Sequence, residues 1–258
     1  KIIYLFVSVT LMMACTSEPH YVIKGNIEGY DSLTFMLQKR EAGKFVTIDS
    51  AISNKGNFKM KGATEYPIVV YLSARNTRNR TQFYLENSEI TVTGKLDSLF
   101  DAKISGSKTQ DELRSIIDAN EPLSKKYNEI YIQFQGAKQE NNAEKAAQLQ
   151  KQLDDLEKEM GQIEKDFVNN HPSSFVTPSI LASMSYDMEA AEIEAAISKL
   201  DTNVAKVKVI QDLKAKAAAM KIVSIGQKAP DFTLNDVKGN PVSLYSKVGA
   251  KLLLVDFW

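Results

Sequence analysis

The chain has 258 residues, of which 43% are hydrophobic and 25% are charged, as in ordinary soluble globular proteins. Its 32 basic and 32 acidic side chains balance, so it lacks the basic excess that is typical of nucleic-acid-binding proteins. One cysteine and two histidines allow neither an intrachain disulfide nor a zinc-finger spacing. We expect no cofactor, no metal site and no nucleic-acid partner.

The N-terminal segment has the features of a secretory signal. A basic residue, Lys1, precedes the almost wholly apolar stretch 2–14. That stretch is too short to cross a bilayer as a helix, which takes about 20 residues, but it suits the apolar part of a signal peptide. We therefore expect a signal peptide over residues 1–14 and export from the cytoplasm.

The end of this segment, Leu11-Met12-Met13-Ala14-Cys15, resembles a bacterial lipobox. The resemblance implies cleavage before Cys15, whose thiol would then carry a diacylglyceryl group. Several acyl chains hold a protein on a membrane where a single chain does not. We expect a lipidated tether over residues 15–20 and a lipid-anchored protein of the cell envelope, which faces the periplasm because no acidic run follows the cysteine. The alternative is an ordinary signal peptide with an incidental cysteine.

Residues 21–106 alternate between apolar and polar side chains, with glycine and asparagine between the runs. This pattern predicts short strands joined by turns. Phe58 and Met60, for example, fall on one face of a strand, whereas Lys59 and Lys61 fall on the other. About eight such runs at this spacing predict an antiparallel β-sandwich or an open barrel.

The order of these runs resembles a domain of unknown function that precedes thioredoxin domains in envelope lipoproteins. The matching segments are Ile23-Lys24-Gly25, Ile48-Asp49-Ser50-Ala51, Gly56-Asn57-Phe58, Leu85-Glu86-Asn87 and Ile90-Thr91-Val92. The resemblance implies spacing, docking or partner contact rather than catalysis. Within this module, Arg75, Arg78 and Arg80 fall in an expected hairpin loop, which is either a solvated loop tip or a site for an anionic ligand.

Residues 107–222 change to a helical spacing of apolar side chains. Thr109 and Glu112 fit a capping box at the start of a helix. Two heptad seams follow, one over Leu123–Ala137 and one over Leu149–Phe167. The seams are out of phase, so the chain forms either an antiparallel hairpin, which we favour, or one helix with a shifted face. Asn170-His171-Pro172 is expected to end the second helix.

Shorter helices are expected between residues 174 and 220. We expect this helical region to act as a stalk or as the interface of a homodimer. Asp154, Asp155, Glu157 and Glu159 surround the second seam among basic and polar side chains. We interpret these carboxylates as a solvated helix face rather than a catalytic group.

The C-terminal residues 223–258 carry the most specific resemblance. The segment 226–232, Gly-Gln-Lys-Ala-Pro-Asp-Phe, resembles the first motif of the AhpC/TSA–redoxin group, and 238–244 resembles its next hairpin, with Gly239 in the turn. Residues 251–258 resemble its core strand. The resemblance implies the first strands of a thioredoxin-like α/β domain, truncated before a Cys-x-x-Cys pair. Val255-Asp256-Phe257-Trp258 resembles the thioredoxin and TlpA-like branch more than the peroxiredoxins.

That branch implies thiol–disulfide exchange, in which one cysteine attacks a substrate disulfide and a second resolves the mixed disulfide. Asp256 matches the acid that takes a proton from the resolving thiol in thioredoxins. The alternative is a polar residue without that role, since many TlpA-like proteins have asparagine there. Either role belongs to the full-length protein, because this fragment lacks the cysteine pair. The implied partners are disulfide-bearing proteins and a membrane electron donor.

Taken together, these patterns predict an α+β protein with an antiparallel β-sandwich or barrel, a helical middle region and the start of a thioredoxin-like domain. The expected function is redox homeostasis in the envelope as a TlpA-type thiol–disulfide oxidoreductase. The alternatives are a non-enzymatic binding or structural lipoprotein with a degenerate redoxin domain, and a lipid-anchored peroxiredoxin. The residues that follow Trp258 would distinguish the three.

Overall fold

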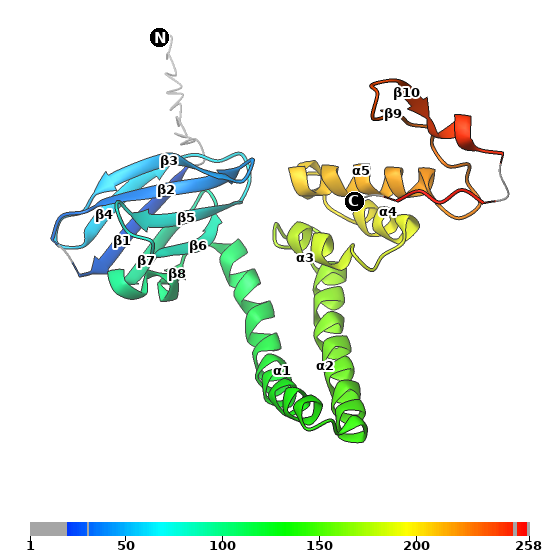
Figure 1. Cartoon of the computed structure of the whole chain (residues 1–258). Coiled ribbons are helices and arrows are strands. Elements are labelled where there is room, and N and C mark those ends of the chain that lie inside the picture. The colour runs from blue at the N-terminus through cyan, green and yellow to red at the C-terminus, as the bar shows by residue number, and fades with distance from the viewer. Residues whose placement is uncertain (1–19, 30, 250–251, 257–258) are drawn as a thin grey trace, which may run out of the picture. The chain divides into compact units, whose positions relative to one another are not determined.

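The computed structural model describes residues 20–29, 31–249 and 252–256 (Figure 1). It contains both β-sheets and α-helices, as predicted, and they divide into two compact units. The first unit extends to Ala119 and the second begins at Asn120. The boundary lies within one helix, α1, which spans Lys108–Gln139.

The first unit is built from two four-stranded sheets. One sheet has the strand order β4-β1-β7-β8 and the other has the order β3-β2-β5-β6. A 3-10 helix, η1 (Leu96–Asp101), separates β7 from β8 along the chain. The strands are β1 (Tyr21–Glu28), β2 (Thr34–Glu41), β3 (Lys44–Ile52), β4 (Asn57–Gly62), β5 (Ile68–Ala74), β6 (Arg80–Leu85), β7 (Glu89–Lys95) and β8 (Lys103–Ser105).

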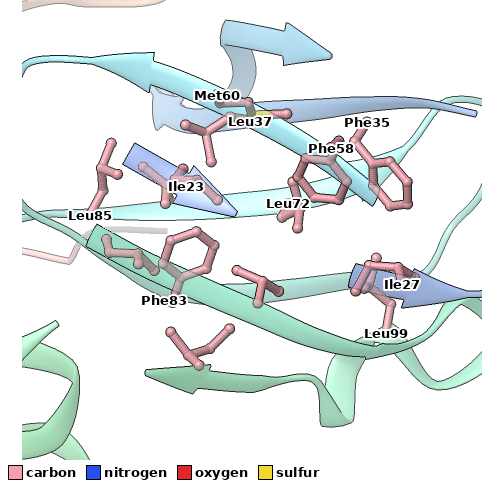
Figure 2. Packing of buried hydrophobic residues seen from close by; sticks show 14 of the residues in the cluster. Ile23, Ile27, Phe35, Leu37, Phe58, Met60, Leu72, Phe83, Leu85 and Leu99 are labelled. Atoms are coloured by element: carbon pink, nitrogen blue, oxygen red, sulfur yellow. The ribbon is translucent and has the colours of Figure 1, made fainter. Parts of the chain in front are cut away.

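Both sheets contribute to one hydrophobic core, so the unit is sandwich-like (Figure 2). Ile23 and Ile27 of β1 are buried there, together with Leu72 of β5 and Phe83 of β6. Burying apolar surface of this kind is the main favourable contribution to folding. The core therefore depends on side chains from both sheets.

The alternation predicted for β4 is confirmed. Phe58 and Met60 are buried, whereas Lys59 and Lys61 are exposed, because successive side chains of a strand point to opposite faces. The pairing of β4 with β1 places Phe58 directly opposite Gly25. An aromatic residue of the core thus faces a residue that has no side chain.

The ring of Phe58 occupies the space that a side chain at position 25 would fill. It stacks on Phe35 of the other sheet, with the ring centroids 4.4 Å apart. A Cβ atom at Gly25 would lie 2.0 Å from the Phe58 ring, far inside van der Waals contact. The glycine is therefore what allows this aromatic pair to join the two sheets.

The prediction of a purely antiparallel sheet arrangement is wrong at one pair. β1 pairs with β7 in parallel, from Val22 opposite Glu89 to Glu28 opposite Lys95. A parallel pair needs a long connection, and here β2 to β6 lie between the two strands along the chain. Periodicity reports which side chains share a face, but it carries no information on the direction of a distant partner strand.

Strand β3 forms one edge of its sheet and contains an irregularity. Its pairing with β2 shifts between Leu37, opposite Asp49, and Gln38, opposite Thr47, so that Ile48 has no partner across the pair. A bulge of this kind bends a strand and interrupts its hydrogen-bond ladder. Most of the strand is exposed.

Helix α1 begins with polar contacts to strand β6 and to the loop that follows β6. The Ser107 hydroxyl accepts a hydrogen bond from the Gln110 amide over 3.1 Å, and the Gln110 side-chain oxygen accepts one from the Tyr84 amide of β6 over 3.1 Å. The Thr109 hydroxyl donates to the Glu86 carboxylate over 2.7 Å. The predicted capping role of Thr109 is therefore wrong: Ser107 caps the helix, since Glu86 takes the threonine hydroxyl.

The predicted helical hairpin is confirmed in the second unit. Helix α2 spans Ala143–Asn170 and follows α1 after a short turn (Figure 1). The Tyr127 hydroxyl donates to Glu157 over 2.9 Å, and Ser124 contacts Met160 at 3.8 Å, so the two helices are antiparallel. The side chains of both seams share one core, which contains Ile130, Phe134, Ala137, Leu149, Leu153 and Leu156.

The shorter helices predicted after α2 occur in the predicted order. Helix α2 ends at Asn170, and His171 caps it with its backbone amide and lies flat against Phe167. None of the helices in the described residues is both long and apolar enough to span a membrane. The remaining elements are α3 (Thr177–Met184), α4 (Ala190–Ser198), η2 (Val204–Lys206), α5 (Lys208–Ile222), β9 (Thr233–Asn235), β10 (Pro241–Ser243) and η3 (Leu244–Lys247).

Replacing Gly25 with alanine should destabilise the first unit by about 1–3 kcal/mol, because the Phe58 ring must move to make room. A matched replacement, Gly136→Ala in α1, places its Cβ where nothing lies within 4 Å and should stabilise the helix by up to about 1 kcal/mol. Urea unfolding followed by circular dichroism measures both changes. Effects of the same sign would contradict the proposed role of the Gly25–Phe58 contact.

Candidate functional site

The sequence analysis singles out two site residues, Cys15 and Asp256, and the structure describes one of them. Cys15 lies outside the described residues. Asp256 is exposed and belongs to no helix or strand. The core strand predicted over 251–258 is not formed by its described residues, 252–256, and Leu254 is 87% exposed. A strand is stable only when neighbouring strands satisfy its backbone, and no described strand pairs with this segment.

The carboxylate of Asp231 organises the segment before this tail. It accepts hydrogen bonds from the Tyr245 amide over 2.9 Å and from the Ser243 hydroxyl over 2.8 Å. These donors lower the pKa of Asp231, because they stabilise its charged form. The Tyr245 hydroxyl in turn donates to the Ala229 carbonyl over 2.5 Å. The Ala-Pro-Asp motif is thus held against β10 and η3.

A second carboxylate shapes the hairpin of β9 and β10. Asp236 accepts hydrogen bonds from the Asn240 amide over 2.9 Å and from the Lys238 amide over 2.8 Å. These contacts lower its pKa, the Asn240 amide most of all. Gly239 has φ +85, a left-handed conformation that glycine adopts without strain, so the turn predicted at this position is confirmed. Both carboxylates act as turn-forming acceptors.

The predicted arginine loop lies between β5 and β6. Arg75 and Arg78 are exposed. Arg80 is engaged on the sheet: its guanidinium lies 4.2 Å from the centre of the Phe45 ring, which meets Tyr71 edge to face at 5.0 Å. The three arginines therefore do not form one anion-binding site. The position of Arg80 is explained by its cation–π contact with Phe45.

A shallow polar pocket lies at one end of the β4-β1-β7-β8 sheet. It encloses about 370 Å³ between Asn26, Thr93, Lys95, Asp101 and Lys103, among others. Across the described residues, no group of histidine, cysteine, aspartate and glutamate side chains is placed to hold a metal ion. The pocket offers hydrogen bonds and balanced charge, since two acids and two lysines line it.

A larger groove lies within the second unit, along α2 beside α3 and α4. It encloses about 890 Å³. Apolar side chains and one glycine form part of its surface: Gly161, Val168, Leu181, Met184, Met188 and Ala196. Charged side chains form much of the rest: Asp154, Glu157, Lys158, Glu164, Lys165, Asp187 and Glu192.

The sequence analysis did not identify this groove, although it did place Asp154 and Glu157 on a solvated face. The heptad seam of α2 marks only the face that packs on α1. The groove lies on another face of that helix. Its only signs in the sequence are weak: a glycine at 161 inside a long helix and methionines at 184 and 188. A surface that combines three helices cannot be read from one periodicity.

Residues 21–113 match the model of a protein family described as a Domain of unknown function (DUF4369). The match covers the eight strands β1 to β8 of the first unit and includes the first turn of α1. No curated protein matches the chain, and no solved structure matches it.

Several residues that suggested the resemblance have structural roles within this matched segment. Gly25 and Phe58 form the close contact of the core. Glu86 accepts from Thr109 at the start of α1. The Asn87 side chain bonds both the amide and the carbonyl of Thr64, over 3.0 and 2.6 Å. These side chains stabilise the fold. Glu86 and Asn87 also line a small pocket of about 320 Å³ together with Thr64 and Lys108.

The lowered pKa of Asp231 predicts a pH-dependent local structure. Its hydrogen bonds stabilise the segment above about pH 4, the range where the carboxyl of an unfolded chain is charged. This stabilisation is lost as the pH falls through the lowered folded-state pKa. We expect the amide proton resonance of Tyr245 to shift with a midpoint below about 3.9, as measured by NMR.

Two variants control this titration. Asp231→Asn should abolish the shift of the Tyr245 resonance, since no ionisable group remains at its acceptor. Ser243→Ala should move the midpoint upward, because one of the donors to the carboxylate is lost while the carboxylate stays. A midpoint at or above the ordinary aspartate value in the unmodified chain would contradict the structure of this segment.

Proposed function

We propose that this chain belongs to an envelope-anchored thiol–disulfide oxidoreductase of the TlpA-like group. In this proposal residues 21–106 form a non-catalytic module, residues 107–222 form the helical region, and residues 223–258 begin a thioredoxin-like domain. The single observation that carries the proposal is the local structure of the segment 226–245. Its Ala-Pro-Asp motif, hairpin and turn glycine follow one another in the order that the redoxin resemblance implies, and Asp231 ties them into one structure.

The chemistry of this proposal needs two cysteines that the sequence of this chain does not contain. One thiolate attacks a sulfur of the substrate disulfide and forms a mixed disulfide. The second thiol loses its proton and displaces the substrate, which leaves reduced while the cysteine pair becomes a disulfide. A membrane electron donor then returns two electrons to the pair. Asp256 is the proposed acceptor of the resolving thiol's proton in the full-length protein.

A non-enzymatic binding lipoprotein is the second candidate function. The observation that favours it is the groove of the helical unit, which is larger than the polar pocket of the sandwich and combines apolar and charged side chains. Binding and redox activity can coexist in one protein, so the cysteines decide whether binding is the whole function.

The redox proposal predicts a Cys-x-x-Cys codon pattern soon after the codon of Trp258 in the parent gene. In the protein that carries this pair, Asp256→Asn should slow disulfide reduction by at least about tenfold at neutral pH, within the range of lost proton-transfer catalysis. Asp155→Asn, which changes an exposed carboxylate of α2, is the matched control and should leave the rate unchanged. Reduction of insulin disulfides measures the rates, and a reading frame without the cysteine pair would overturn the proposal.

The proposed lipid anchor predicts a simple change of location. Cys15→Ser should prevent lipidation, because serine lacks the thiol that forms the thioether, and should move the protein out of the membrane fraction. Ser17→Ala, two residues further on, should leave it in the membrane fraction. Cell fractionation and incorporation of labelled palmitate measure both, and a membrane-bound, unlabelled wild-type protein would contradict lipidation at Cys15.

A further inference from the structure

We propose that the groove along α2, α3 and α4 binds a cationic amphipathic helix of a partner protein. The surface lies wholly within the second unit. This inference goes beyond the proposed redox activity and does not depend on it. It rests on the shape of the groove, its apolar surface and its charge.

The apolar surface of the groove suits side chains of varied shape. Met184 and Met188 are half-buried and supply accessible apolar surface, whereas the neighbouring lining residues Val168 and Leu181 are buried. Methionine has a flexible, polarisable side chain that adapts to different apolar partners. Such a surface can accept the leucine or methionine anchors of an amphipathic segment without requiring one fixed shape.

Gly161 leaves room in the wall that α2 contributes. A Cβ atom there would meet nothing within 4 Å, so packing within the chain does not require a glycine. Glycine inside a helix costs about 1 kcal/mol relative to alanine. The open space beside Gly161 therefore belongs to the groove and is available to an incoming side chain.

The charge of the groove favours a basic partner. Five carboxylates line it, against two lysines, whereas the chain as a whole has no net charge. Among the described residues, none of these five carboxylates forms an ion pair, and Lys158 pairs with Asp155 outside the groove. Three of them, Asp154, Glu157 and Glu192, accept hydrogen bonds from uncharged donors, which leaves their negative charge without a cationic partner. Carboxylates without an ion pair around an apolar surface attract lysine and arginine side chains and repel acidic partners.

The secondary structure around the groove favours a helical occupant. Its walls are mainly helices, whose backbone groups are bonded internally, and the short connection between α3 and α4 contributes Asp187 and Met188. No strand in the described part of the chain lines the groove, so it offers no strand edge to an extended peptide. A helix satisfies its own backbone groups and inserts only side chains, which is the usual mode of helix-in-groove recognition. The acidic rim disfavours anionic lipid headgroups, and it disfavours a second copy that approaches with the same surface.

The test uses a synthetic helical peptide of leucine and lysine, with leucines at the i, i+3, i+4, i+7 spacing. Its counterpart has glutamate in place of every lysine. Fluorescence anisotropy with the chain should show saturable binding of the lysine peptide, weakened by added salt, and binding of the glutamate peptide at least about tenfold weaker. Binding of both peptides alike would overturn the charge argument.

Three variants locate the binding site. Gly161→Leu should fill the groove and weaken binding by at least about tenfold while favouring the helix, and Glu164→Lys should weaken it to a similar extent. Glu159→Lys makes the same change of charge on α2 outside the groove and should alter binding less than about twofold. Circular dichroism checks that each variant is folded.

Three outcomes would overturn the proposal. The first is equal weakening by Glu164→Lys and Glu159→Lys, which would indicate attraction to the general charge of the helix. The second is self-association of the chain that Gly161→Leu abolishes, which would assign the groove to a second copy. The third is binding of the chain to vesicles of anionic lipid that Glu164→Lys strengthens and Glu159→Lys does not.

Discussion

The contact between the two sheets of the first unit is the constraint on which that unit depends. Neither four-stranded sheet can keep its apolar face in water, so each covers the face of the other. The stacked rings of Phe58 and Phe35 lie at this junction. They fit only because Gly25 leaves its side of β1 empty. A single missing side chain thus determines how closely the sheets approach at this point.

Helix α1 belongs to both compact units, and it is stabilised differently at its two ends. Its first turn is held by hydrogen bonds. Glu86 accepts from the Thr109 hydroxyl at the start of the helix, and Gln110 accepts from the Tyr84 amide of the edge strand β6. Its last turns are held by apolar packing on α2, where Phe134 and Ala137 are buried. The family match to residue 113 includes the first of these regions, so the start of the helix is matched together with the sandwich.

The sequence predicted the elements better than it predicted their partners. The alternation of Phe58 with Lys59 located β4, and the shift between two heptad seams indicated the hairpin, because both signals come from neighbouring residues. The parallel pairing of β1 with β7 joins residues far apart in the chain and leaves no periodic signal. The helix cap was misplaced because Ser107 and Thr109 fit the same local pattern, and only the distant Glu86 distinguishes them. The groove was missed for the same reason, since three helices form it.

The irregular edge strand β3 bears on how the first unit meets neighbouring protein chains. Phe45 and Ile52 are exposed on this strand, and an exposed apolar edge invites pairing with another chain. The unpaired Ile48 interrupts the regular spacing of backbone donors and acceptors there. A neighbouring chain therefore cannot add a strand in continuous register, so the bulge protects the module against edge-to-edge aggregation.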